Sequence, residues 1–258
     1  MNHFSDEQAN GMQSGRSPLV SIVTVAYNVA KGLERTILSV DAQSYENVEF
    51  IIIDGGSTDG TLDVIRKHKA KIDCWVSEPD DGIYDAMNKG VRLAKGKWLN
   101  FMNAGDVFVS DHVLAQIRFE EYEGDVLIYG DSKRRDGINL APSRLSLLRD
   151  GIIFACHQAM FFNRELLSDQ LYYDSSKKIY ADYELVDRLF LFYPNKFRYV
   201  EVTVVESEGG GVSSYPSLRK RCDKFLILKS HYGLRHALRV FTRRVIEIWF
   251  SKFFQKLK

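Results

Sequence analysis

Polar side chains that could bind a ligand follow three separate apolar segments of this chain. Carboxylate, amide and hydroxyl groups hold polar ligands through hydrogen bonds. The apolar segments are residues 19–26, 48–53 and 98–102, and the polar side chains shortly after them are Tyr27, Asn28, Asp54, Ser57 and Asp106. Strands of a parallel sheet bind ligands beyond their carboxyl ends. If the three segments are such strands, the sequence predicts a binding site at that edge of the sheet.

The stretches between these segments have the pattern of helices. Apolar residues recur at helical spacing over residues 32–42, 58–68 and 83–95. Further strands are expected at 72–77 and 126–129. The strand segments are short and apolar throughout, which indicates a sheet covered on both faces. Alternating strands and helices predict βαβ units, and therefore an α/β fold with a mostly parallel central sheet.

The pattern changes after about residue 131, where arginines lie in loop-like surroundings. There we expect an apolar segment at 159–162, a helix at 180–192, a strand at 197–205 and helix from 217 onward. No internal repeat or interdomain linker is visible. We therefore expect a flexible N-terminal segment over 1–17, a single domain over 18–216 and a helical C-terminal region over 217–258.

Composition excludes several classes of protein. A formal net charge of +1 gives no general electrostatic reason to bind nucleic acid. The three cysteines are widely spaced and form no CxxC pair, which fits a reducing compartment without disulfides. The first 17 residues are polar, unlike a secretory signal, and no apolar run is long enough to cross a membrane. These features predict a cytoplasmic location.

The sequence lacks the motifs of several enzyme classes. No GxGxxG opens the first helix and no GxxxxGK[ST] occurs, which argues against nicotinamide-dependent dehydrogenases and P-loop enzymes. A nucleotidyltransferase would need a basic, glycine-rich loop early in the chain, and none is visible. Cys156 and His157 are neighbours, but neighbours along a strand point to opposite faces. We therefore do not expect them to form a nucleophile and its base.

Several motifs, taken in order, resemble family 2 glycosyltransferases of the GT-A fold. They are SIVTVAYN from residue 21, VEFIIIDGGSTDGT from 48, SEPDDGIYDAMNKGVRLAKGKWLNFMNAGD from 77, HQAMFF from 157, ADYEL from 181 and GGGVSS from 209. Within the family the chain looks closest to the colanic-acid type of exopolysaccharide glycosyltransferase. The resemblance covers about residues 18–214. It implies a Rossmann-like catalytic domain and inverting transfer of a sugar from a nucleotide-diphosphate sugar, in surface polysaccharide biosynthesis.

By the family's pattern, one group of side chains holds the nucleotide sugar, with a UDP-sugar favoured. An acidic side chain can accept hydrogen bonds from a uracil N–H or from ribose hydroxyls. The alternative for Asp54 is a turn that caps the following helix. Met87 stands where many members carry an arginine, so one phosphate contact is missing. The residues implied are Ala26, Tyr27, Asn28, Asp54, Ser57, Asp81 and Asn88.

Residues 103–106 occupy the place of the family's metal-binding DxD motif. Gly105 replaces an aspartate, so Asp106 is the carboxylate expected to hold Mg²⁺ or Mn²⁺ against the diphosphate. Asp80 or Asp81 could supplement it from a facing loop. The alternative is that Asp106 caps a turn. The incomplete motif also leaves open a second function, a non-catalytic nucleotide-sugar-binding or membrane-complex subunit.

Asp182 matches the family's general base, which takes the proton of the acceptor hydroxyl as it attacks. Glu184 is a nearby competitor, and a surface carboxylate at a helix start is the alternative for Asp182. His157 and Gln158 are expected to line the acceptor or diphosphate side, or else to form a buried structural pair. Residues 209–214 could close over the donor as a lid.

The C-terminal residues 233–258 combine basic and apolar residues at helical spacing. Glu247 is the only carboxylate in this stretch, which carries seven arginines and lysines. A basic amphipathic helix can lie on an anionic membrane surface. This fits a saccharide acceptor linked to lipid and a peripheral position on the cytoplasmic face of the membrane. The alternative is that the helix packs on the catalytic domain or on a second copy of it.

Overall fold

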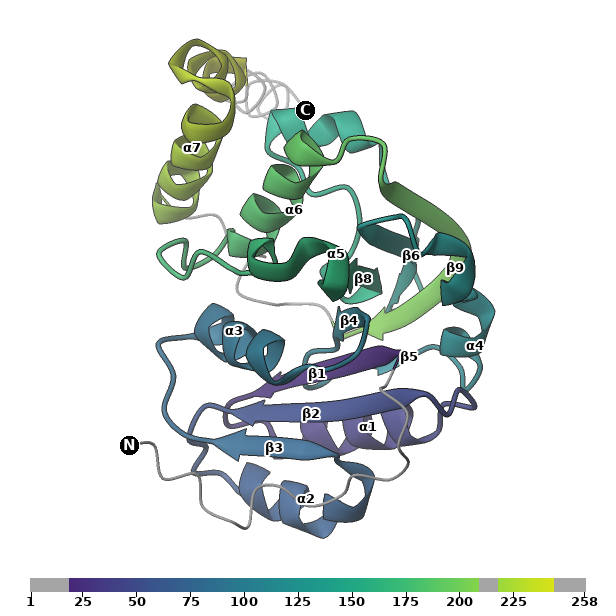
Figure 1. The fold of residues 1–258 in the computed structure, drawn as a ribbon. Helices are drawn as coiled ribbons and strands as arrows, with labels where there is room; N and C mark the ends of the chain where they lie inside the picture. The colour runs from purple at the N-terminus through teal and green to yellow at the C-terminus, as the bar shows by residue number, and fades with distance from the viewer. Residues whose placement is uncertain (1–18, 209–217, 244–258) are drawn as a thin grey trace, which may run out of the picture.

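A computed structural model describes residues 19–208 and 218–243 of the chain. Its sheet has the strand order β3-β2-β1-β4-β8-β6-β9-β5, and β7 pairs with β6 at one side. The first part of this order is parallel throughout and lies side by side in Figure 1. These parallel strands are β1 (Val20–Ala26), β2 (Val48–Asp54), β3 (Cys74–Ser77) and β4 (Trp98–Phe101). The α/β class and the strand–helix alternation predicted from the sequence are confirmed.

The second part of the sheet mixes the two directions. β6 and β9 are parallel to each other, whereas β8 runs antiparallel to both of its neighbours, β4 and β6. β5 and β7 are short antiparallel additions to β9 and β6. The bounds are β5 (Val107–Phe108), β6 (Leu127–Arg134), β7 (Asn139–Leu140), β8 (Met160–Asn163) and β9 (Phe197–Ser207). The prediction of a mostly parallel sheet holds because the longest ladders are the parallel ones.

β6 extends beyond the predicted segment 126–129 and ends at Arg134. Its polar end has no apolar signal in the sequence, yet Lys133 pairs with Asn139 of β7 and with Glu206 of β9. Backbone pairing therefore decides the length of this strand, and that pairing comes from segments far away in the chain.

Helices cover both faces of the parallel strands. Ile22 of β1 packs in one apolar cluster with Leu33 and Ile37 of α1 (Ala30–Asp41). Val23, the next residue, belongs to a cluster on the other face, together with residues of α3 (Ile83–Leu93) and α6 (Ala181–Phe192). A Cβ on Gly90 of α3 would lie 2.3 Å from Val23, so only glycine allows this close approach of helix to sheet. The apolar strands are thus covered on both sides, as their composition predicted.

Short helices and 3₁₀ turns connect these elements. They are α2 (Thr61–Lys67), η2 (Lys69–Lys71), α4 (Val113–Ile117), η3 (Phe119–Tyr122), η4 (Leu145–Asp150), η5 (His157–Ala159), α5 (Arg164–Leu167) and η6 (Ser168–Gln170).

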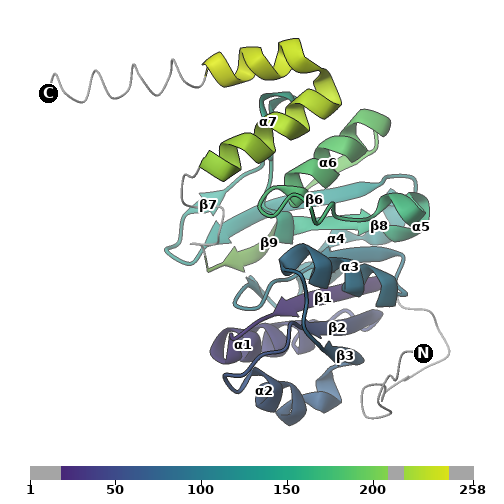
Figure 2. The ribbon, with the colours of Figure 1, turned by 90° about the vertical axis from the view of Figure 1, so that its left-hand side faces the viewer.

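The described part of the C-terminal region, residues 218–243, is helical as predicted, in two pieces. α7 (Leu218–Tyr232) ends at Gly233, whose φ of +84° breaks the helix, and residues 234–243 are helical again. Glycine adopts this left-handed backbone without a steric penalty. Figure 2 shows the chain reversing direction after α7. The predicted N-terminal segment 1–17, the proposed lid 209–214 and residues 244–258 lie outside the described residues.

Candidate active site

A cavity of about 780 Å³ opens at the carboxyl ends of β1 and β2. Tyr27 follows β1 and Gly55 and Gly56 follow β2 on its wall, and the loop after β4 adds Asn103. The first turn of α3 closes another side with Ile83. Ligand pockets typically have volumes of roughly 300–1,000 Å³. The cavity lies at the edge of the sheet where the sequence placed the binding site.

The loops after β1 and β2 are fastened to each other beside this cavity. The backbone N–H of Asn28 donates to the Ser57 hydroxyl at 2.8 Å, and the Asn28 side chain accepts from the N–H of Thr58 at 2.8 Å. Asn28 adopts a φ of +50°, which asparagine tolerates better than most residues. Tyr27 remains 66% exposed on the cavity wall, beside Ala26. Asn28 and Ser57 therefore hold the wall in shape, and the ring of Tyr27 is exposed on that wall.

Asp54 is fully buried and its carboxylate points into its own loop. It accepts hydrogen bonds from the N–H groups of Gly56 (3.2 Å) and Ser57 (3.1 Å) and from the hydroxyls of Ser57 (2.5 Å) and Ser77 (2.6 Å). These contacts hold the turn after β2, but Asp54 does not cap the following helix, because α2 begins only at Thr61 with Gly60 at its N-cap. The wall of the cavity next to Asp54 is the backbone of Gly55 and Gly56.

The loop before α3 brings Asp80, rather than Asp81, to the cavity. Asp80 lines the wall, and a Cβ on Gly55 would lie 2.4 Å from its Oδ2 atom. The Asp81 residue is exposed; its carbonyl accepts from Lys178 at 2.9 Å and its N–H donates to Asp85 at 3.3 Å. Sequence position could not separate two adjacent aspartates, because the choice depends on how the loop turns.

Asp106 lies behind the cavity wall at the end of the β4 loop and is 7% exposed. Its carboxylate accepts from the Gln158 amide at 2.8 Å and from the N–H of Glu208 at 2.9 Å. Burial raises the pKa of Asp106. Gly105 has a φ of +109°, and a Cβ there would lie 2.6 Å from Glu208 Oε2. The Glu208 carboxylate thus occupies the side where an aspartate at position 105 would project, and sequence reasoning missed it.

The described residues hold no group of three or more His, Cys, Asp or Glu side chains that could bind a metal. Asp106 and Glu208 nevertheless bring two carboxylates to the end of the β4 loop. Mg²⁺ is commonly bound through one or two carboxylates together with substrate phosphates. Gln158 already binds Asp106, and Arg35 and Arg135 pair with Glu208, so these two carboxylates would hold a divalent ion only in exchange for such partners.

Asp182 lies in the first turn of α6 and is half-buried. Its Oδ1 atom accepts from the Tyr84 hydroxyl at 3.1 Å and from the N–H of Tyr183 at 2.8 Å. Tyr84 is in the first turn of α3, between Ile83 and Ala86 of the cavity wall. Tyr84 was not expected from the sequence, although it stands inside the IYDAMNKG segment.

His157 is buried beside this carboxylate and is not a base for Cys156. Its Nε2 atom lies 2.8 Å from the Tyr173 hydroxyl, and its ring stacks on Phe101 with centroids 5.5 Å apart. Burial lowers the pKa of His157, which keeps the imidazole neutral. Cys156 instead contacts Gln158 at 3.0 Å, and burial raises the pKa of its thiol to about 11. His157 is a buried, hydrogen-bonded residue, while Gln158 connects to Asp106.

The model of glycosyl transferase family 2 matches residues 21–171, which include the cavity, the Asp106 loop and Tyr84. The chain belongs to this family. It is therefore a glycosyltransferase, with a Rossmann-like GT-A fold and a helical C-terminal region.

Curated relatives of this chain are named as glycosyltransferases. The glycosyltransferase is 32% identical over 237 residues to the "PGL/p-HBAD biosynthesis glycosyltransferase" of Mycobacterium bovis, with 88% of this chain and 91% of the relative covered. It is 38% identical over 106 residues to the "UDP-Glc:alpha-D-GlcNAc-diphosphoundecaprenol beta-1,3-glucosyltransferase WfaP" of Escherichia coli, which covers 41% of this chain and 42% of the relative.

Solved glycosyltransferases share the fold at low sequence identity. TarS of S. aureus, residues 1–349 in complex with UDP-GlcNAc, has a TM-score of 0.65 at 15% identity, covering 86% of this chain and 70% of that chain. The match spans 42% of the longer TarS chain. Glucosyl-3-phosphoglycerate synthase of Mycobacterium tuberculosis, in complex with Mn²⁺, UDP and glucosyl-3-phosphoglycerate, has a TM-score of 0.57 at 15% identity, covering 88% of each chain.

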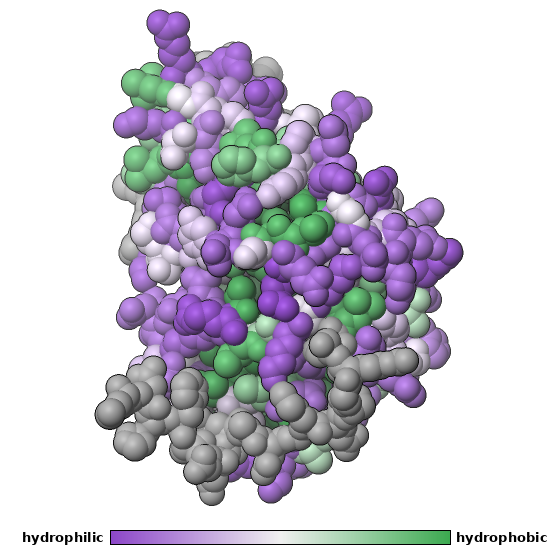
Figure 3. Space-filling model, in the orientation of Figure 1, coloured by the Kyte–Doolittle hydropathy of each residue, from purple (hydrophilic) through white to green (hydrophobic). Residues whose placement is uncertain are grey.

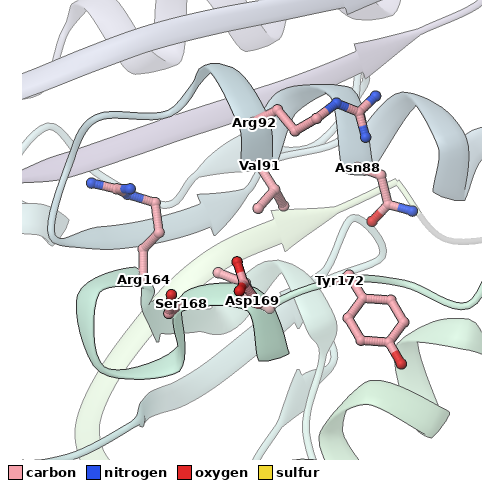
Figure 4. Close-up of a pocket in the computed structure, with 8 residues that line it drawn as sticks. Asn88, Val91, Arg92, Arg164, Ser168, Asp169 and Tyr172 are labelled. Atoms are coloured by element: carbon pink, nitrogen blue, oxygen red, sulfur yellow. The ribbon is translucent and has the colours of Figure 1, made fainter.

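Asn88 of the glycosyltransferase lies one turn of α3 beyond Tyr84 and away from the main cavity. Its side chain pairs with the backbone N–H and carbonyl of Tyr173, both at 2.8 Å. It lines a second cavity of about 420 Å³ together with Arg92 of the same helix and with Arg164 and Asp169 (Figure 4). Asn88 therefore fixes the chain segment that leads to Asp182.

Glu184, the competitor of Asp182 in the sequence, faces the C-terminal helix. It pairs with Arg188 at 3.0 Å and with His231 of α7 at 3.5 Å, and its side chain is 10% exposed. Arg188 and His231 thus pair with the Glu184 carboxylate on the side of α6 that packs against α7. Of the two residues, Asp182 is the one joined to the wall of the cavity.

Proposed function

We propose that this glycosyltransferase moves a sugar from a UDP-sugar to a lipid-linked saccharide in one inverting step, during surface polysaccharide biosynthesis. The observation that carries the proposal is the contact of Asp182 with Tyr84, on the helix that lines the donor cavity. The acceptor oxygen attacks the anomeric carbon while its proton passes to Asp182. The bond from that carbon to the diphosphate oxygen breaks, and UDP leaves with the electron pair.

In the proposed donor complex, the uracil base stacks on the exposed ring of Tyr27. The backbone of Gly55 and Gly56 approaches the ribose, because neither residue has a side chain to keep the ligand away. Asp54 acts through this loop by holding its turn, and Asn28 and Ser57 join the loop to the one after β1. Solved relatives of the same fold contain UDP or UDP-GlcNAc, which supports the choice of donor.

A divalent ion, Mg²⁺ or Mn²⁺, would be held by Asp106 with Glu208 beside it. When bound, such an ion neutralises the charge that develops on the departing diphosphate. Gln158 holds one oxygen of Asp106 in place at 2.8 Å. Arg135 pairs with Glu208 at 2.7 Å and keeps its carboxylate near the β4 loop.

The proposed acceptor brings the protein to the cytoplasmic face of an anionic membrane. No helix of the described residues is both long and apolar enough to span a bilayer. In the helical segment 234–243, Ala237 and Val240 are buried against α7, while Leu234 is 51% and Leu238 46% exposed. Figure 3 shows hydrophobic residues among hydrophilic ones over the C-terminal helices. The buried residues of this segment support the alternative that the helix packs on the protein itself. Its exposed leucines support contact with a membrane. WfaP, by its name, uses a diphosphoundecaprenol-linked acceptor.

Asp182→Asn tests the catalytic part of the proposal. The variant keeps the shape of the side chain and can still accept from Tyr84, so we expect UDP binding to be unchanged by calorimetry. Turnover falls by about a hundred- to ten-thousand-fold, which is the usual contribution of a general base. The assay follows UDP release from UDP-glucose with GlcNAc-diphosphoundecaprenol as acceptor, and UDP-GlcNAc as a second donor. Glu184→Gln is the matched control on the same helix. A near-normal rate in Asp182→Asn rejects Asp182 as the base.

A further inference from the structure

We propose that Tyr84 is a positioning residue, whose hydroxyl holds Oδ1 of Asp182 and leaves Oδ2 to take the acceptor's proton. This inference rests on the proposed role of Asp182 as base. Within residues 19–208 and 218–243, both hydrogen bonds to this carboxylate reach Oδ1, and no partner contacts Oδ2. The two oxygens are therefore unequal before any substrate binds. One is fixed by Tyr84 and by the N–H of Tyr183, and the other is left for the substrate.

Tyr84 is suited to donate to a carboxylate throughout the reaction. It is 8% exposed, and burial, followed by the charge of Asp182, raises the pKa of its hydroxyl. The proton therefore stays on Tyr84 at any working pH. Its ring stacks on Tyr173, with centroids 5.6 Å apart, so the hydroxyl has little freedom to move away. A rigid donor in a water-poor setting can fix a carboxylate more firmly than solvent can.

Two further titratable groups near this carboxylate carry no charge. Tyr173, from the segment before α6, has its pKa raised by burial. His157, from the 3₁₀ turn η5, has its pKa lowered by burial. Tyr84, Tyr173 and His157 thus surround Asp182 with neutral groups, and the Tyr84 hydroxyl is its direct side-chain contact among the described residues.

The Tyr84 hydroxyl has a single proton and two possible acceptors. The carbonyl oxygen of Ile179 lies at 2.8 Å and Oδ1 of Asp182 at 3.1 Å. A hydrogen bond to an ionised carboxylate is stronger than one to a carbonyl, so Tyr84 donates to Asp182 while Asp182 is charged. Once Oδ2 has taken the acceptor's proton, the carboxyl is neutral and Ile179 becomes the better acceptor. The hydroxyl can follow the charge by rotating its O–H bond, without moving the ring.

The position of Tyr84 also connects the base to the donor. Its neighbours Ile83 and Ala86 line the donor cavity, and all three belong to the first turns of α3. A donor seated against α3 therefore contacts the same rigid helix that aims Asp182. Residue 182 is 98 positions away in the chain and depends on this contact for its orientation.

The test compares Tyr84→Phe with Tyr199→Phe in the full chain. Tyr199 is the control, because its hydroxyl also donates to a carboxylate, Oδ1 of Asp131 at 3.0 Å, and it lies outside the proposed site. We expect Tyr84→Phe to lower kcat by roughly 10- to 150-fold, the usual value of a hydrogen bond to a charged group. The KM for the UDP-sugar stays the same, and the acid limb of the kcat profile moves to higher pH. In Tyr199→Phe, kcat and the acid limb both keep their wild-type values.

A double variant separates positioning from folding. If Tyr84 acts through Asp182, adding Tyr84→Phe to Asp182→Asn causes no further loss, because the two act as one unit. A loss of equal size in both backgrounds would assign Tyr84 a structural role only and overturn the inference. The inference would also be overturned if Tyr84→Phe kept the wild-type kcat and the wild-type acid limb while Asp182→Asn was inactive. An active Asp182→Asn enzyme would instead reject the proposed base itself.

Discussion

The ion pair between His231 of α7 and Asp187 of α6 is expected to make the stability of this glycosyltransferase depend on alkaline pH. His231 Nδ1 lies 2.7 Å from Asp187 and its Nε2 lies 3.5 Å from Glu184, with the His231 side chain 12% exposed and that of Asp187 fully buried. Burial alone lowers the pKa of His231, but the hydrogen bonds to Asp187 and Glu184 outweigh it and raise the pKa to about 9.

The size of the effect follows from this pKa. The ordinary value is 6.5 and the folded value is about 9, a difference worth about 3 kcal/mol at 1.36 kcal/mol for each pH unit. The folded pKa is the higher of the two, so the stabilisation is complete below about pH 6.5. It is lost as the pH rises through about 9. For a domain of this size, about 3 kcal/mol corresponds to roughly 6–12 °C in Tm.

Urea unfolding of wild type and His231→Asn at pH 6, 8 and 10 measures this contribution. Asparagine can still donate to Asp187 but carries no charge. The difference in unfolding free energy should be largest at pH 6 and shrink by about 3 kcal/mol by pH 10. Tyr232→Phe is the control: it removes the 2.5 Å hydrogen bond to Asp187 but keeps His231, so its pH dependence should match wild type. A difference between wild type and His231→Asn that is constant across this range would refute the reasoning.

Three further predictions concern ligands. Tyr27→Ala should weaken UDP binding by roughly 5- to 150-fold in calorimetry, since stacking of a base on an aromatic ring is worth about 1–3 kcal/mol; unchanged affinity would remove Tyr27 from the base site. Asp106→Ala should abolish the gain in UDP affinity on adding Mn²⁺, whereas Glu206→Ala, on the neighbouring strand end, should keep it; a gain that survives in Asp106→Ala rejects the metal role. Full-length protein should float with anionic liposomes at low salt and less at high salt. A chain ending at Gly233 retains the contacts of α7 with α6 and should not float; equal flotation of the two chains would show that residues 234–258 are not the anchor.

Local sequence determined the architecture around the cavity beside Tyr27 and the family of the protein. The β-branched segments that became β1 and β2 are apolar throughout, which is the signature of strands covered on both faces, and their helices follow at the expected spacing. Because strands of this kind bind ligands at their carboxyl ends, the cavity beside Tyr27 could be placed before any coordinates were known. A sequence pattern reports on residues that are close together in the chain. The strands, the helices after them and the polar strand ends are all set by such residues.

The tertiary structure decided which atoms of the site face the cavity and which are already occupied. Asp54 turns inward because Ser77, 23 positions away, adds a hydrogen bond that no local pattern reveals. Glu208 reaches the loop after β4 from 102 positions beyond Asp106, and Tyr84 meets Asp182 across 98 positions. Hydrogen-bond partners and burial come from segments that only the folded sheet brings together. The sequence could therefore name Asp54, Asp106 and Asp182, but neither Glu208 nor which of these carboxylates have their oxygens already occupied.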